Sequence, residues 1–523
     1  MSFFYQKLPR NCKKNAIFQP KSKTIIMSLF RKKDLTAMLA QSEDGSKGLK
    51  RTLGAGNLIA LGIGAIIGAG LFVRTAAAAG QAAGPAVTIS FIIAAVGCAF
   101  AGLCYAEFAA MIPIAGSAYA YSYVTMGELI AWIIGWALIM EYALGAATVS
   151  IAWSEYLNKL TGGAIPYEWS HSPFESFTDS MGVAHTGIMN APALIILLAL
   201  TLLLIKGSQE SAIVNAIIVF IKVAIVILFI AIGWQFIKPE NHTPYMIPAG
   251  QAAVTDSAGK VIADYSGAFK HGWGGVLGGA VIVFFAFIGF DAVSTAAQEA
   301  KNPKRDMPIG ILGSLIVCTI LYILFGHVLT GVANWKDFVD PEKGREASVA
   351  YAISTYMTGY GWLATAVTVA ILAGFSSVIL VMLMGQSRIF YSMSKDGLLP
   401  KAFGDLHPKY QTPYKSNWIL FVFVGLFAAF VPGSVAGDLT SFGTLFAFVL
   451  VSLGVWILRR KSPEMERPFK TPLVPIVPIL GAVVCMGMIV ALDMQTLKVA
   501  FIWMILGLFV YFFYSKKTSK LNN

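Results

Sequence analysis

Long apolar runs separated by short polar loops are the feature that most restricts the fold of this 523-residue chain. A helix needs about 20 mostly apolar residues to cross a bilayer, and twelve stretches come near this length. Only 13% of the residues are charged, against roughly 25% in soluble proteins. The sequence therefore predicts an all-α polytopic membrane protein. The twelve predicted spans are 54–79, 85–112, 127–158, 189–206, 211–237, 273–299, 307–333, 358–392, 416–432, 436–458, 472–493 and 496–515.

The basic residues predict how these spans are oriented. Of the 39 Lys and Arg residues, 29 lie in segments that an even number of spans places on one side, and about eight lie at the opposite ends and loops. Lys and Arg are enriched on the cytoplasmic side of membrane proteins. Both termini are therefore expected in the cytoplasm. The net charge of +12 therefore reflects basic loops on the cytoplasmic side of the membrane, and no nucleic-acid partner is expected.

The polar N-terminus and the cysteines carry little further information. Residues 1–51 form a basic cytoplasmic segment without the apolar core of a signal peptide. "MSLFRKKDL" at Met27 reads as an ordinary bacterial start, so 1–26 is a possible misassigned extension, expected to be disordered. Four of the five cysteines lie in apolar runs and none has metal-ligand spacing, so no metal site is expected. The sequence "IPIAGSAYAYSYVTMGE" (112–128) predicts a short helix at the membrane surface.

Two spans contain glycines where a helix should be strongest. The first carries "GIGAIIGAGLF" (62–72), and the sixth carries "FIGFD" (287–291). Each glycine weakens a helix by roughly 1 kcal/mol relative to alanine. Broken spans at matching positions in two halves indicate an inverted-repeat transporter. We therefore expect five-helix repeats at 52–237 and 273–458, two extra helices within 472–515, and a cytoplasmic tail at 516–523.

A helix break at mid-membrane exposes backbone groups that lipid cannot solvate, so it must lie in protein or line a polar cavity. The second half-helix offers free N–H groups and a positive dipole end, which suit a carboxylate. The first half-helix offers free carbonyls, which suit an ammonium group. The pair is therefore suited to an α-amino acid. The alternative is that the glycines serve close helix packing, since Gly64 and Gly68 have GxxxG spacing.

From about residue 30 to its end, the sequence resembles the amino acid–polyamine–organocation superfamily. The motifs are "GIGAIIGAGLFV", "IPIAGSAYAYSY" and "FFAFIGFDAVSTAAQEAKNPKRDMPIGI", and within the superfamily they are most similar to the cationic amino acid transporter family and its bacterial relatives. The resemblance implies the leucine-transporter-type fold and proton-driven uptake of L-amino acids, with no cofactor beyond the proton. It places the substrate carboxylate on the amides of Gly68, Ala69 and Gly70. It places the amine on carbonyls of Ile66, Phe285 and Ile288, beside Gly289, with Phe285 as a gate.

Ionisable residues within the spans are the candidates for coupling, since charge there is expensive. Lys222 lies in the middle of the fifth span. By resemblance it takes the place of a sodium ion and bridges the broken first span to the eighth, so that its protonation state controls the first span. Glu141 is a second candidate: by resemblance an acidic residue here is important near the substrate, where it can favour cationic side chains or relay protons, and the alternative is a helix–helix tie. Asp291 follows the second break, where it can cap a helix or join the proton path, and capping is slightly favoured.

The cytoplasmic end of the second span contains Glu107, a candidate for an inner gate. Arg388 and Lys301 are its candidate partners. The side-chain pocket is expected to involve spans 3, 6, 8 and 10, and Ser376, Ser377 and Met382 are guesses for its lining.

The prediction is thus a secondary active amino acid transporter in the plasma membrane, with the bilayer as its surroundings. An exchanger or passive facilitator on the same fold is the alternative, and a small single-span accessory peptide is an open question. A channel would need a continuous polar lining, and an enzyme would need a catalytic motif such as HExxH. Neither is present in the sequence. The sequence leaves cationic and neutral amino acids both open as substrates.

Overall fold

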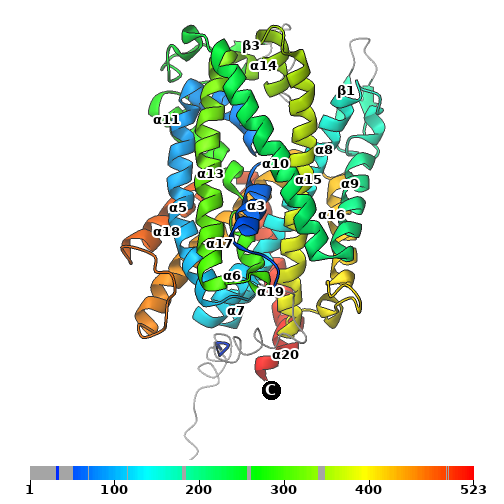
Figure 1. The fold of residues 1–523 in the computed structure, drawn as a ribbon, viewed down its shortest axis with the longest axis vertical. Coiled ribbons are helices and arrows are strands. Elements are labelled where there is room, and N and C mark those ends of the chain that lie inside the picture. The colour runs from blue at the N-terminus through cyan, green and yellow to red at the C-terminus, as the bar shows by residue number, and fades with distance from the viewer. Residues whose placement is uncertain are drawn as a thin grey trace, which may run out of the picture.

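The computed structural model describes residues 31–34, 51–68, 70–114, 116–178, 184–255, 261–339, 348–490, 492 and 494–522. These residues form a bundle whose long helices run along the vertical axis of Figure 1. In the described part, eight helical segments are long and apolar enough to cross a membrane, and four shorter apolar helices of 10–17 residues accompany them. The fold is therefore that of a mostly helical, polytopic membrane protein.

The first half of the described chain has eight α-helices. They are α3 (Ala55–Ile66), α4 (Thr75–Ala78), α5 (Val87–Met111), α6 (Ser117–Thr125), α7 (Glu128–Ile139), α8 (Gly145–Leu160), α9 (Ala191–Lys206) and α10 (Ser208–Gly233).

The second half has ten. They are α11 (Gly272–Phe284), α12 (Ala292–Thr295), α13 (Pro303–Val332), α14 (Ser348–Tyr356), α15 (Gly361–Lys395), α16 (Tyr414–Phe430), α17 (Gly433–Lys461), α18 (Ile476–Val490), α19 (Met494–Val510) and α20 (Lys516–Thr518).

Two loops between the helices contain short β-hairpins. Strands β1 (Ser176–Thr178) and β2 (Ala184–Thr186) form one antiparallel hairpin, and β3 (Val254–Thr255) and β4 (Val261–Ala263) form another. β1 and β3 lie at the upper end in Figure 1, and the C-terminus lies at the lower end.

Both predicted helix breaks are present. Helix α3 ends at Ile66, Ile67 is extended, and helical structure resumes with the π-helical turn η1 (Gly70–Arg74). Helix α11 ends in the 3₁₀ turn η8 (Phe285–Phe287), Ile288 is extended, and α12 begins at Ala292. Gly289 has φ +110°, a conformation that glycine adopts readily. Glycine at this position therefore permits the turn out of the first half-helix.

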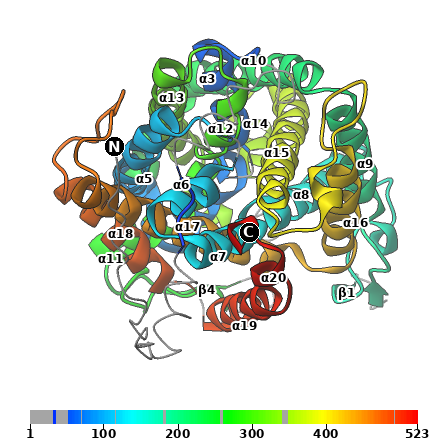
Figure 2. The same ribbon diagram turned by 90° about the horizontal axis from the view of Figure 1, so that it is seen from below.

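The segment after α5 is helical as predicted, and it packs inside the protein. Every residue of α6 is buried within the protein, and in Figure 2 α6 lies well inside the outline of the bundle. Its alternating Tyr and small residues fill space between helices.

The outer helices carry the apolar surface that a bilayer requires. In Figure 2 α9, α16, α18 and α19 lie near the rim. Large exposed side chains on these and neighbouring helices include Ile195, Phe220, Val422, Val483 and Phe501. Water would solvate these side chains poorly, whereas lipid tails accommodate them.

Candidate functional site

The two helix breaks lie directly against one another. A Cβ atom at Gly70 would stand 2.2 Å from the Cα atom of Ala286, and one at Gly289 would stand 2.8 Å from the Cβ of Ala65. Real Cβ atoms do not approach other atoms this closely, so both positions require glycine. The packing interpretation of the glycines is therefore correct at these positions, and it is what brings the two breaks together.

A tyrosine holds the two breaks in register. The Tyr322 hydroxyl of α13 lies 2.9 Å from the carbonyl oxygen of Ile66 and 2.8 Å from that of Ala286. It can donate its proton to either acceptor. Exposed backbone at mid-membrane is costly unless it finds a partner, and this buried hydroxyl is a donor within reach of both breaks. Tyr322 was not predicted as a site residue. Its hydroxyl within an otherwise apolar span was the signal that could have identified it.

A small pocket of about 20 Å³ opens where the breaks meet. Gly68, Gly70, Ile66, Phe285 and Ile288 all line it, so the structure brings together five of the predicted substrate residues. Gly289 packs beside it against Ala65, and Ala69 lies outside the described residues. The remaining lining residues are Ala65, Gly145, Val149, Val378, Met382 and Thr440.

These lining residues come from the first broken span and from spans 3, 6, 8 and 10, the four that the sequence analysis expected. Of the three guesses for the side-chain pocket, Met382 lines it. Ser376 instead bonds the carbonyl of Leu372 in its own helix, and Ser377 bonds groups near Gly64.

The carbonyls proposed for the substrate amine are partly engaged. Ile66 O accepts from Tyr322, and Phe285 O accepts from the amide of Ile288 at 3.3 Å. A carbonyl oxygen has two lone pairs, so each of these can still accept a proton from an ammonium group.

Lys222 is fully buried and braces the end of α3. Its Nζ donates to the carbonyl of Gly64 at 2.9 Å and to that of Ile67 at 2.8 Å. The Ser377 hydroxyl of α15 lies 3.1 Å from the same Gly64 carbonyl and 2.6 Å from Oδ1 of Asn215. The ammonium therefore holds the first break as expected, while the link to the eighth span passes through the shared Gly64 carbonyl.

A pair of buried carboxyl groups lies between the third and sixth spans. Glu141, in the π-helical turn η4 (Met140–Leu144), and Asp291 are close enough to interact electrostatically. Asp291 Oδ2 accepts from the Tyr142 hydroxyl at 2.6 Å. The side chains of Glu141 and Asp291 also lie close enough to share a hydrogen bond.

The capping role favoured for Asp291 is wrong. Asp291 occupies the N-cap position of α12, but its side chain makes no cap hydrogen bond. Its carboxylate turns instead to Tyr142.

Glu107 does not pair with either of the expected partners. Its carboxylate accepts from Arg459 Nε at 3.0 Å and Nη2 at 2.8 Å, and Arg467 Nε lies 3.3 Å away. Arg388 pairs instead with Glu299, with Nη2 and Oε1 2.5 Å apart and both side chains buried. Sequence alone did not fix these pairs because the partners lie far apart in the chain: Arg459 is 352 residues from Glu107.

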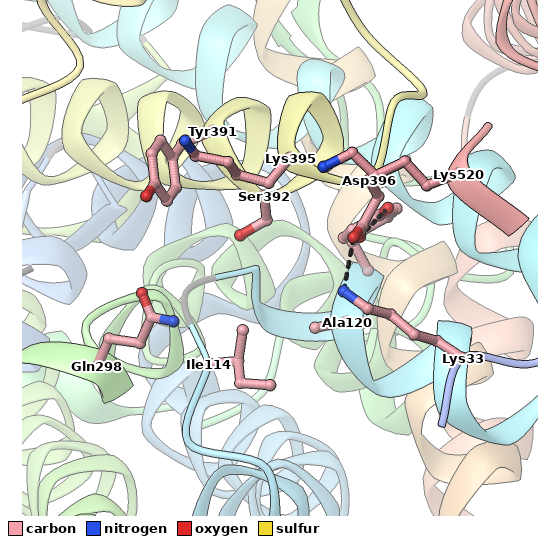
Figure 3. A pocket seen from close by; sticks show the side chains of 10 residues that line it. Lys33, Ile114, Ala120, Gln298, Tyr391, Ser392, Lys395, Asp396 and Lys520 are labelled. Atoms are coloured by element: carbon pink, nitrogen blue, oxygen red, sulfur yellow. Dashed lines mark hydrogen bonds and ion pairs between the residues drawn. The ribbon is translucent and has the colours of Figure 1, made fainter. Parts of the chain in front are cut away.

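A second pocket, of about 250 Å³, lies at the end of the bundle that carries both described chain ends. Figure 3 shows its lining side chains, with Lys33 joined to Asp396; the Nζ–Oδ1 distance is 2.6 Å. Tyr119 donates to the other oxygen of Asp396 at 2.8 Å. None of the residues around the two helix breaks contributes to this pocket.

Comparison with known proteins gives the family of this chain. A model of the amino acid permease family matches residues 53–512. The chain belongs to this family. Its members are transporters rather than enzymes.

Curated relatives cover almost the whole chain. The branched-chain amino acid permease BcaP of Bacillus subtilis is 42% identical over 95% of this chain and 99% of its own length. The methylthioribose transporter of the same organism is 40% identical over the same shares. The vacuolar cationic amino acid transporter 4 of Arabidopsis thaliana is 33% identical over 84% of this chain and 68% of its own length.

Proposed function

We propose that this permease takes up L-amino acids across the plasma membrane by alternating access, driven by a proton gradient. Two five-helix inverted repeats and two extra helices make twelve spans, with both termini in the cytoplasm. In this count of twelve spans, α3 and the helical segment that begins at Gly70 form one broken first span. The names of the relatives give different substrates. The proposal that the substrate is an α-amino acid therefore rests on the family and on the two helix breaks.

One observation carries the proposal: two broken helices meet at a pocket, and a buried lysine holds one of them. The pocket offers backbone groups of Gly68 and Gly70 from one break and carbonyls of Phe285 and Ile288 from the other. Backbone groups can bind both ends of a zwitterion without a charged side chain at the site. This recognises the frame common to all α-amino acids.

The proton acts through Lys222. A protonated Lys222 donates to two carbonyls at the end of α3 and restrains it. A neutral amine has fewer protons to donate and no charge to attract the carbonyl dipoles. Loss of the proton therefore releases α3, which allows the half-helix to move. The Glu141–Asp291 pair supplies a second place for a proton, because two buried carboxyl groups cannot both carry charge cheaply.

The test is uptake of radiolabelled L-leucine and L-alanine into proteoliposomes, with and without an imposed proton gradient. Lys222→Met and Lys222→Ala should lose gradient-driven uptake, at least tenfold, since they cannot release a proton. Lys206→Ala, which removes an exposed lysine at the end of α9, serves as the control.

Gradient-driven uptake that is undiminished in both Lys222 variants would overturn the coupling role. An exchanger would instead show counterflow that needs internal amino acid and ignores the gradient. The same vesicles therefore separate symport from the alternative function.

A further inference from the structure

Tyr322 of α13 reaches both helix breaks through a single hydroxyl group. Its oxygen lies 2.9 Å from the carbonyl oxygen of Ile66 and 2.8 Å from that of Ala286, and its side chain is fully buried. A tyrosine hydroxyl has one hydrogen to donate. It therefore donates to one of these two carbonyls at a time, so two acceptors depend on one donor.

The two carbonyls have different places in the proposed site. Ile66 ends α3, and its carbonyl is one of those proposed for the substrate amine. Ala286 lies in η8, directly after Phe285, the proposed gate. Phe285 and Ile288 both line the pocket, and Ala286 packs directly against Gly70. The hydroxyl thus lies between the carbonyl that would bind the amine and the backbone that carries the gate.

Aromatic contacts hold the Tyr322 ring independently of its hydroxyl. The ring centroids of Phe91, on α5, and Phe287, in η8, each lie 5.3 Å from that of Tyr322. These rings fix the position of the hydroxyl oxygen, while its hydrogen remains able to rotate toward either acceptor. A change of acceptor therefore needs only rotation about the C–O bond, with no movement of the ring.

An ammonium group at the Ile66 carbonyl decides which acceptor the hydroxyl uses. It supplies that carbonyl with a charge-assisted hydrogen bond. Its positive charge also repels the hydroxyl hydrogen, and low polarity in the buried site strengthens that repulsion. The hydroxyl then donates to Ala286 alone. Binding of the amine at the first break is thereby transmitted to the second break, where the hydrogen bond restrains η8.

We propose that Tyr322 is a positioning residue that couples binding of the substrate amine to closure of the gate at Phe285. The inference rests on the proposed function and adds a step to it, since recognition of the amine by one break orders the other. Tyr322 acts through Ala286 and the backbone of η8, and it is not among the described residues that line the pocket.

The test is hydrogen–deuterium exchange of the purified protein in nanodiscs, followed on peptides that cover residues 284–292. L-Leucine at a saturating concentration should slow exchange there at least fivefold in the wild type. Tyr322→Phe keeps the ring and removes only the hydroxyl, so it should bind L-leucine within fivefold of the wild type but show no slowing. 4-Methylpentanoate, which is L-leucine without its amino group, should slow exchange in neither protein. L-Alanine and propanoate replace this pair if the wild type binds alanine more tightly.

Uptake into proteoliposomes gives a second readout. Tyr322→Phe should reduce the maximal rate at least tenfold and leave KM within fivefold, because the substrate still binds but the gate no longer closes. Tyr265→Phe is the matched control. The hydroxyl of Tyr265 is also buried and donates to a backbone carbonyl, that of Gly80 at 2.6 Å, but neither residue lines the pocket. This variant should retain the slowing of exchange at 284–292.

Equal slowing by the amino acid in the wild type and in folded Tyr322→Phe overturns the inference. Slowing by the analogue without an amino group does so as well, as does a wild type that binds the amino acid without any slowing. A folded Tyr322→Phe that no longer binds the amino acid also contradicts it, because the carbonyls proposed for the amine are unchanged in this variant. A wild type that binds neither L-leucine nor L-alanine contradicts the proposed function instead.

Discussion

At the scale of single residues, the two helix breaks can meet only because Gly70 has no side-chain methyl group. A Cβ atom at Gly70 would stand 2.2 Å from the α-carbon of Ala286. The obstacle is backbone, which cannot rotate out of the way as a side chain can. Gly56, in the first turn of α3, has open space around the same position. Both glycines lie in the predicted first span, but only at Gly70 would an added methyl group collide with backbone.

Gly70→Ala should therefore push the two breaks apart. We expect a destabilisation of about 1–3 kcal/mol or more from overpacking, together with a loss of amino acid binding of at least tenfold. Gly56→Ala should retain binding and leave stability unchanged or slightly raised, because alanine favours helix. Thermal unfolding in detergent and ligand titration measure both effects. Normal binding by Gly70→Ala would contradict the contact between the breaks.

At the scale of elements, a buried ion pair ties the second half of the broken sixth span to α15. Glu299 lies in the 3₁₀ turn η9 (Ala297–Glu299), and its side chain is 1% exposed; that of Arg388 is 4% exposed. The carbonyl of Glu299 also accepts from the amides of Thr52 and Leu53, just before α3. One residue thus connects three elements that an alternating-access motion would have to separate.

Removing one member of this pair should cost much more than removing both. Arg388→Met leaves a buried, uncompensated carboxylate, at a cost of about 3–5 kcal/mol. The double variant Arg388→Met with Glu299→Gln should recover most of that loss. The exposed pair Lys415–Asp405 at 2.7 Å is the control, with an expected effect below about 1 kcal/mol. Equal losses in the single and double variants would show that the charge pairing is irrelevant. Urea or thermal unfolding gives the comparison.

At the scale of the whole molecule, the two described chain ends meet at one end of the bundle. Arg31 donates to the carbonyl of Leu521 at 2.5 Å, and Lys33 pairs with Asp396. The buried carboxylate of Glu128 accepts from the hydroxyls of Tyr511 and Ser519. If these two segments lie on one side of a membrane, the chain between them crosses it an even number of times.

Cysteine labelling tests which side that is. The chain with its five native cysteines replaced by serine or alanine receives a single cysteine at Gly162 or at Lys517, both exposed. A membrane-impermeant maleimide should label Gly162→Cys in intact cells, and Lys517→Cys only after the membrane is opened. The opposite pattern would reverse the orientation that the basic residues predict.

The local features of the site were largely predictable from sequence. The broken spans and the depth of Lys222 follow from rules that act within one segment, whereas the clustering of Gly68, Gly70 and Phe285 was implied by the family resemblance. Partners were not predictable in the same way. Glu107 was identified, but Arg459 and Arg467 as its partners were not, because many basic residues satisfy the same local pattern.

The sequence by itself determined that this chain spans a membrane, where its helices break, and which family it resembles. Apolar length, glycine position and motif are local properties, and lipid leaves the backbone few alternatives. Only the tertiary structure decided what each break touches: Ala286 against Gly70, and Tyr322 between two carbonyls. These contacts join segments hundreds of residues apart, and packing geometry, which no single segment encodes, selects among many chemically equivalent partners.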